Sequence, residues 1–119
     1  MAPAPAGSTL IARYTSRPLS VLIGDVNKFS NNFMAEQVLR TLGLVKRGRG
    51  DWNAGRDEVF DFARAEVGLT GFRYANGSGL FGDTALSSHE LVTLLSHMSV
   101  RRPALPEYAA SLEIGRAHV

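Results

Sequence analysis

A polar triplet between two apolar helical stripes constrains this chain more than any other feature. The triplet is Ser30-Asn31-Asn32. The stripes are Leu19, Leu22, Ile23 and Val26 before it, and Met34, Ala35, Val38, Leu39 and Leu42 after it. Apolar residues at these spacings predict one amphipathic helix on each side of a polar turn. Two rigid helices would hold Ser30 and Asn32 at a fixed point, which is what a chemical site requires.

The same triplet also has a purely structural interpretation. Ser and Asn are preferred helix N-caps, so Ser30 or Asn31 could simply begin the second helix. A Ser-x-Asn spacing by itself favours this cap over a site. The residues around the triplet change that balance.

Those residues follow a recognisable order. Residues 28–43 read Lys-x-Ser-Asn-Asn-x-x-Ala-Glu-x-x-Leu-Arg-x-Leu-Gly, and residues 76–80 read Asn-Gly-Ser-Gly-Leu. Leu86-Ser87 then opens another predicted helix. Over residues 9–112 this ordered set resembles the D-alanyl-D-alanine carboxypeptidase/endopeptidases, the low-molecular-mass class C penicillin-binding proteins.

The resemblance implies a role for two residues of the triplet. Ser30 would be catalytic and shuttle a proton toward the departing D-alanine amine, and Asn32 would bind substrate by donating its side-chain amide to the peptide carbonyl. It also implies peptidoglycan stem peptides and β-lactams as partners, no cofactor, and a periplasmic or cell-envelope location.

The rest of the serine acyl-transfer machinery is missing from the sequence. Penicillin-binding proteins take their nucleophile and general base from Ser-x-x-Lys, and use Lys-Thr-Gly as a third motif. The only lysines are Lys28 and Lys46, neither follows a serine by three positions, and no Lys-Thr-Gly occurs. We therefore expect a fragment of the enzyme that has essentially no turnover alone.

The expected fold class is α+β, mostly α here: the helical part of a penicillin-binding-protein/β-lactamase-like transpeptidase fold. Residues 1–8 read as a linker, and residues 9–112 as the transpeptidase-like part. Predicted helices cover about 18–29, 34–43, 55–67 and 87–98, and short strands cover 9–14 and 71–74. Gly43 is a natural helix stop, and Ser87 with Glu90 forms a capping box.

Other candidate sites have simpler explanations. The two glycines of residues 76–79 predict a tight turn, and no Lys-Ser/Thr follows to make a phosphate loop. Trp52 is expected to be a packing anchor rather than a platform for a sugar or base. His89 and His97 lack a third clustered ligand, so we expect no metal site. The basic cluster 46–49 is short and broken by glycine, which argues against a nucleic-acid surface.

The two ends of the chain carry separate expectations. No signal peptide is visible in residues 1–7, and no apolar run is long enough to span a membrane. Residues 114–119 leave the family pattern and read like the translation of a common sequencing adapter, so we expect residues 113–119 to be a non-native tail. Two alternatives stay open: a fragment of a related serine β-lactamase, and a non-enzymatic helical interaction module.

Overall fold

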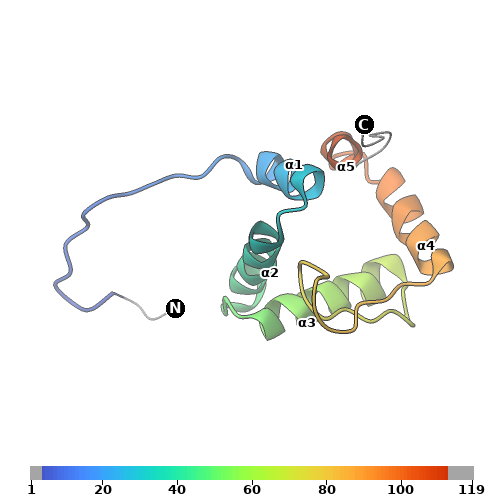
Figure 1. The fold of residues 1–119 in the computed structure, drawn as a ribbon, viewed down its shortest axis with the longest axis horizontal. Coiled ribbons are helices and arrows are strands. Elements are labelled where there is room, and N and C mark those ends of the chain that lie inside the picture. The colour runs from blue at the N-terminus through green and yellow to red at the C-terminus, as the bar shows by residue number, and fades with distance from the viewer. Residues whose placement is uncertain (1–3, 113–119) are drawn as a thin grey trace.

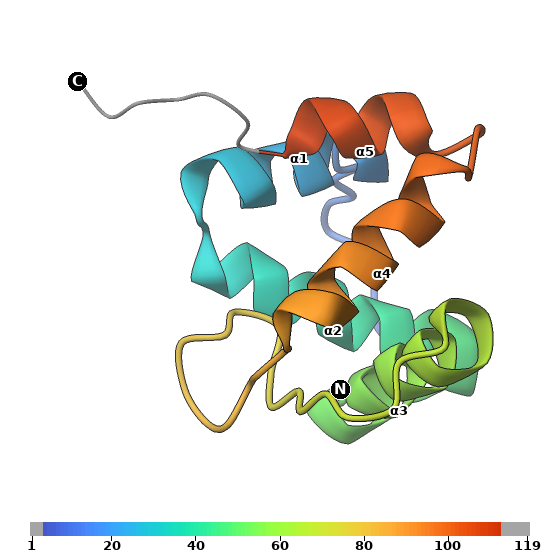
Figure 2. The ribbon, with the colours of Figure 1, turned by 90° about the vertical axis from the view of Figure 1, so that its right-hand side faces the viewer.

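The computed structural model describes residues 4–112, which form helices joined by loops (Figure 1). The helices are α1 (Leu19–Phe29), α2 (Asn32–Arg47), α3 (Trp52–Phe62), α4 (Ser88–Ser99) and α5 (Leu105–Ser111), with a π-helical turn, η1 (Ala63–Val67), directly after α3. They follow one another around a circuit, and α5 returns to lie against α1 (Figures 1 and 2). The Asn27 side-chain amide donates to Ser111 Oγ at 2.9 Å and joins these two helices.

The closest helix contact is between α2 and α3, and glycine makes it possible. A Cβ on Gly55 would lie 2.3 Å from the Leu39 carbonyl oxygen, and one on Gly43 would lie 2.6 Å from the Gly55 nitrogen. No side chain fits at such distances, so the two backbones touch directly. Leu39 and Ala54 are buried beside this contact.

The second helix extends beyond its predicted end. Gly43 was expected to stop it, but α2 continues to Arg47. Gly43 serves the contact with α3 instead, and the stop is Gly48, which has a φ of 70°. The Gly48 N–H donates to the Leu44 carbonyl at 3.0 Å, as expected for a left-handed helix end. The sequence pattern could not distinguish a packing glycine from a terminating one.

The third helix begins earlier than predicted. Asp51 caps it by accepting a hydrogen bond from the Ala54 N–H at 2.8 Å, so α3 starts at Trp52 rather than near Gly55. Trp52 is 60% exposed, and the expectation of a packing anchor is wrong. The predicted stop at Gly68 is confirmed by its φ of 83°, although the last turn before it is π-helical.

A second small core joins η1, the loop after it and α4. Its buried residues are Ala63, Val67, Leu69 and Phe72, with Phe60, Tyr74 and Leu94 packed partly against them. The predicted capping box of α4 is confirmed, because Ser87 and Glu90 bond each other reciprocally. Glu90 Oε1 also accepts from the Gly71 N–H at 3.0 Å, and these bonds, the one from the Ser87 backbone foremost, lower its pKa. The loop is thereby fixed to the start of α4.

The two predicted strands are wrong. Within residues 4–112 the only β-pairing is a single bridge between Arg73 and Ala85. Residues 9–14 are extended and exposed, with Ile11 97% exposed, because no neighbouring segment offers its backbone for pairing. The mostly helical character is confirmed, while the β part of the expected α+β fold is not seen in the described residues.

Much apolar surface remains open. The radius of gyration is 16.5 Å, whereas a compact chain of about 100 residues has about 13 Å, and the extended segment before α1 contributes to the excess. Phe29, Phe33 and Val45 are each more than 70% exposed. Among residues 4–112 no helix combines the length and the apolarity needed to cross a bilayer. The expected non-native tail lies outside the described residues.

The glycine contact gives a matched test of stability. Gly55→Ala should lower the free energy of unfolding by about 1–3 kcal/mol, because its Cβ meets rigid backbone. Gly24→Ala should raise it by roughly 0.5–1 kcal/mol, because Gly24 lies inside α1 with no atom within 4 Å of an added Cβ. Urea unfolding followed by circular dichroism measures both. Equal effects of the two substitutions would contradict the close backbone contact.

Candidate active site

Ser30 occupies the turn between α1 and α2 in a conformation that side chains disfavour. Its φ of 50° and ψ of 46° are left-handed, and it is the one non-glycine residue of the described part of the chain with a positive φ. This conformation costs a non-glycine residue on the order of 1 kcal/mol. Such strained positions cluster at functional sites, and Ser30 is exposed and reachable.

The structural alternative for the triplet belongs to Asn31. Its Oδ1 accepts a hydrogen bond from the Met34 N–H at 3.0 Å, and its backbone is extended, as in an N-cap. The cap prediction is therefore confirmed for Asn31. Ser30 and Asn32 flank the cap and do not perform this function.

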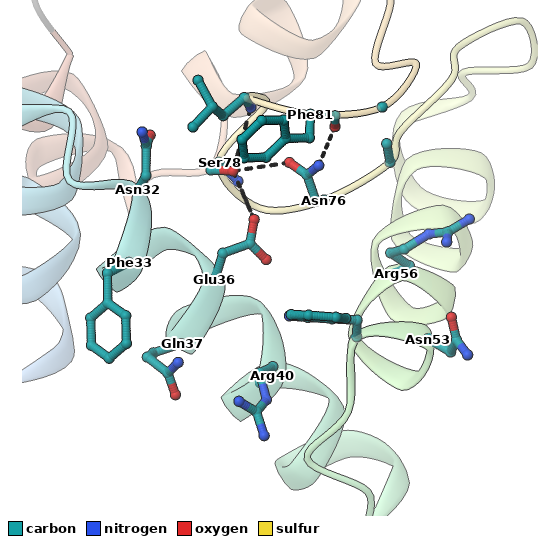
Figure 3. A pocket seen from close by; sticks show the side chains of 14 residues that line it. Asn32, Phe33, Glu36, Gln37, Arg40, Asn53, Arg56, Asn76, Ser78 and Phe81 are labelled. Carbon is teal, nitrogen blue, oxygen red and sulfur yellow. Dashed lines mark hydrogen bonds between the residues drawn. The ribbon is translucent and has the colours of Figure 1, made fainter.

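Asn32 is the first residue of α2 and lies at an open pocket of about 740 Å³ (Figure 3). The walls come from α2, α3 and the loop 75–82, and include Asn32, Glu36, Trp52, Arg56, Ser78 and Phe81. Ser30 does not line this pocket. The structure thus places the two predicted site residues on one turn, with only Asn32 in the pocket wall.

Glu36 connects two walls of the pocket. Its Oε1 accepts hydrogen bonds from the Ser78 N–H at 3.0 Å and from the Ser78 hydroxyl at 2.8 Å (Figure 3). Gly77 lies against the same helix turn, where an added Cβ would be 2.7 Å from the Ala35 carbonyl oxygen. The loop is therefore attached to α2 one helical turn after Asn32.

The loop itself is folded around Asn76. The Asn76 Oδ1 accepts from the Gly79 N–H at 2.7 Å, and its amide nitrogen bonds the Phe81 carbonyl. Gly79 has a φ of 68°, so the predicted tight turn uses a left-handed glycine there. These bonds place Phe81 in the pocket wall opposite α2.

Three ionisable side chains, those of Tyr74, Glu36 and Arg56, influence one another. Burial raises the pKa of the Tyr74 hydroxyl above 10.0, the nearby Glu36 carboxylate raises it further, and the Arg56 guanidinium lowers it. Glu36 Oε2 and Arg56 Nε are both buried without hydrogen-bond partners among the described residues. Both residues line the pocket, but these two atoms are buried and do not face its open space.

The structure shows where the other sequence candidates lie. Residues 4–112 contain no group of three or more metal-ligating side chains, and the His97 ring packs edge-on against Phe62 at 6.0 Å. Within the basic cluster, Arg47 pairs with Glu58 at 3.3 Å and with Asp61. The absence of a nucleic-acid partner stays a prediction.

Comparison with known proteins identifies the family. Residues 1–116 match the D-Ala-D-Ala carboxypeptidase 3 (S13) family. This chain belongs to that family. A D-alanyl-D-alanine carboxypeptidase of Actinomadura sp. (strain R39) is 30% identical over 106 residues, which are 88% of this chain and 20% of the relative. No solved structure matches the chain at a significant level.

Family membership confirms the resemblance found in the sequence. The chain spans about a fifth of the length of this curated relative. The link between Glu36 and Ser78 could not be predicted from the sequence. Both residues lie in the quoted motifs, but they are 42 positions apart, and no pattern in one sequence pairs them.

The charge arrangement around Tyr74 gives a pH prediction. Glu36→Gln should lower the pKa of Tyr74 toward 10.0, because a neighbouring negative charge disfavours tyrosinate, and Arg56→Gln should raise it. Ultraviolet titration of tyrosinate, with Tyr74→Phe to assign the signal, measures both shifts. Because the folded pKa is raised, this group's contribution to stability is complete below pH 10.0 and is lost as the pH rises through the folded pKa. Shifts in the reverse directions would contradict the arrangement.

Proposed function

We propose that this chain is a segment of a serine-type D-Ala-D-Ala carboxypeptidase/endopeptidase that acts on peptidoglycan peptides through an acyl-enzyme. Membership of the S13 family supports the carboxypeptidase activity. The observation that carries the residue assignment is the turn between α1 and α2, where a strained Ser30 and a pocket-lining Asn32 flank a helix cap. The complete enzyme would work in the periplasm or cell envelope, where its substrate lies.

Asn32 would bind the substrate. An amide side chain at the first position of a helix has a fixed backbone and can donate to the carbonyl of a peptide in the adjoining pocket. The N-terminus of α2 also carries a partial positive charge, which favours negative charge developing on that carbonyl oxygen. Asn32 would therefore contribute more to binding the transition state than to binding the substrate.

Ser30 would move a proton. Its hydroxyl can accept a proton and pass it on, and the left-handed backbone of this residue holds the side chain outside both helices. The leaving amine of D-alanine needs one proton when the peptide bond breaks. Ser30 would relay that proton from the nucleophile's base, which this chain does not contain.

The two alternatives differ from this proposal in measurable ways. A serine β-lactamase would hydrolyse the penicilloyl ester rapidly, whereas a carboxypeptidase would hold it as a long-lived label. A helical interaction module would have no acylation to lose, and replacing Ser30 or Asn32 would leave its activity unchanged.

Penicillin labelling tests the proposal. The full-length gene product that contains this segment should form a covalent adduct with a fluorescent penicillin, and the 119-residue chain should not, because it lacks the nucleophile motif. Asn32→Ala and Ser30→Ala should each lower the acylation rate of the full-length product on the order of 100-fold. Labelling followed over time and resolved on denaturing gels measures these rates.

Asn31→Ser is the matched control. Ser can still cap α2, and the substitution removes one amide from the same turn. The acylation rate of this variant should stay within about threefold of the parent rate, because exchanging one good N-cap residue for another changes helix stability little. A covalent label on the 119-residue chain, or wild-type rates for both Ser30→Ala and Asn32→Ala, would refute the proposal.

A further inference from the structure

We propose that Glu36 is a positioning residue, which holds Asn32 at the pocket by fixing the loop 76–82 to the first turns of α2. This inference rests on the proposed function, because it assigns Glu36 a role in a reaction that Asn32 serves. Glu36 touches no reacting atom and acts through another residue. It follows from contacts between segments 42 positions apart in the sequence.

The first step is the relation between Glu36 and Asn32 on the helix. They are one turn apart, so they share one face of α2, and both line the same pocket. The first turn of any helix is its least secure part, because its N–H groups lack partners within the helix. Here the Asn31 cap fixes one of them, and further support must come from outside the helix.

The loop provides that support through two contacts. Glu36 Oε1 receives both the N–H and the hydroxyl of Ser78, and Gly77 allows the loop backbone to touch α2 at the Ala35 carbonyl. A side chain at position 77 would keep the loop backbone away from the α2 backbone. The loop is thus fixed at two neighbouring points of α2, and Figure 3 shows the bonds from Glu36 to Ser78 and from Asn76 to the Phe81 backbone.

The chemistry of Glu36 favours positioning over simple stabilisation. Its carboxylate is half-buried, and its second oxygen is buried with no partner among the described residues. Burial of an incompletely paired carboxylate is a poor source of stability. What the carboxylate does supply is a directional acceptor for two donors on the loop, which fixes the loop's position on α2.

A double-mutant cycle in the full-length gene product tests this role. Glu36→Ala should lower the penicillin acylation rate about tenfold when Asn32 is present, because two hydrogen bonds to the loop are lost. In the Asn32→Ala background the same substitution should change the rate less than about twofold, because residues acting as one unit are not additive. Glu36→Gln keeps an acceptor for Ser78 and should retain most of the rate, whereas Glu36→Asp is one methylene shorter and should lose it.

Glu58→Ala is the matched control for stability. Glu58 is a half-buried carboxylate of α3 that pairs with Arg47 at the far end of α2 from Asn32. It should leave the acylation rate unchanged in both backgrounds while lowering the melting temperature. Equal losses from Glu36→Ala in both backgrounds, or no loss in either, would overturn the positioning role. A wild-type rate for Asn32→Ala alone would overturn the role of Asn32 and with it the positioning role, whereas wild-type rates for both Ser30→Ala and Asn32→Ala would refute the proposed function.

Discussion

Backbone contact between α2 and α3 is the constraint on which the remaining structure depends. Gly43 and Gly55 let the two helices approach until main-chain atoms meet, and Leu39 and Ala54 close over the contact. More buried side chains lie in the second core around η1, so this contact between main-chain atoms is what fixes α2 against α3. It defines the direction of α2, and therefore where the pocket beside the start of α2 lies (Figure 3).

The candidate site combines one strained residue, one cap and one pocket residue in consecutive positions. Asn31 caps the helix start, Ser30 before it has a left-handed backbone, and Asn32 after it begins the helix. Asn31 therefore has the structural role, and Ser30 and Asn32 on either side of it are free for a chemical one. The loop 76–82 adds a long-range contact through Glu36, so the geometry of the turn depends on a segment far along the chain.

Several features could be predicted from the sequence because they depend on near neighbours. The helices around the triplet, the Gly68 stop and the Ser87–Glu90 capping box are of this kind. The predictions failed where contacts with distant segments determine whether a helix ends or a strand forms. Gly43 contacts α3 and does not end α2, and residues 9–14 have strand-like composition but no pairing partner.

The same distinction applies to the site. The motif order around Ser30 and Asn32 identified the family, since a motif is a local pattern that survives without knowledge of the fold. The pocket, the exposure of Trp52 and the attachment of Ser78 to Glu36 all require knowing which segments meet in space. One sequence holds no information on such pairings beyond the residue types themselves.

The hydrogen bond from Asn27 to Ser111 has a consequence for how the helical circuit stays closed. It joins the end of α1 to the end of α5, across 84 positions of sequence, so the last described helix closes against the first (Figure 2). No apolar side chain of α1 or α5 is fully buried there, whereas Ser111 is buried and its hydroxyl also donates to the Tyr108 carbonyl. The circuit is therefore closed by a polar contact, and opening it would leave a buried hydroxyl with one partner fewer.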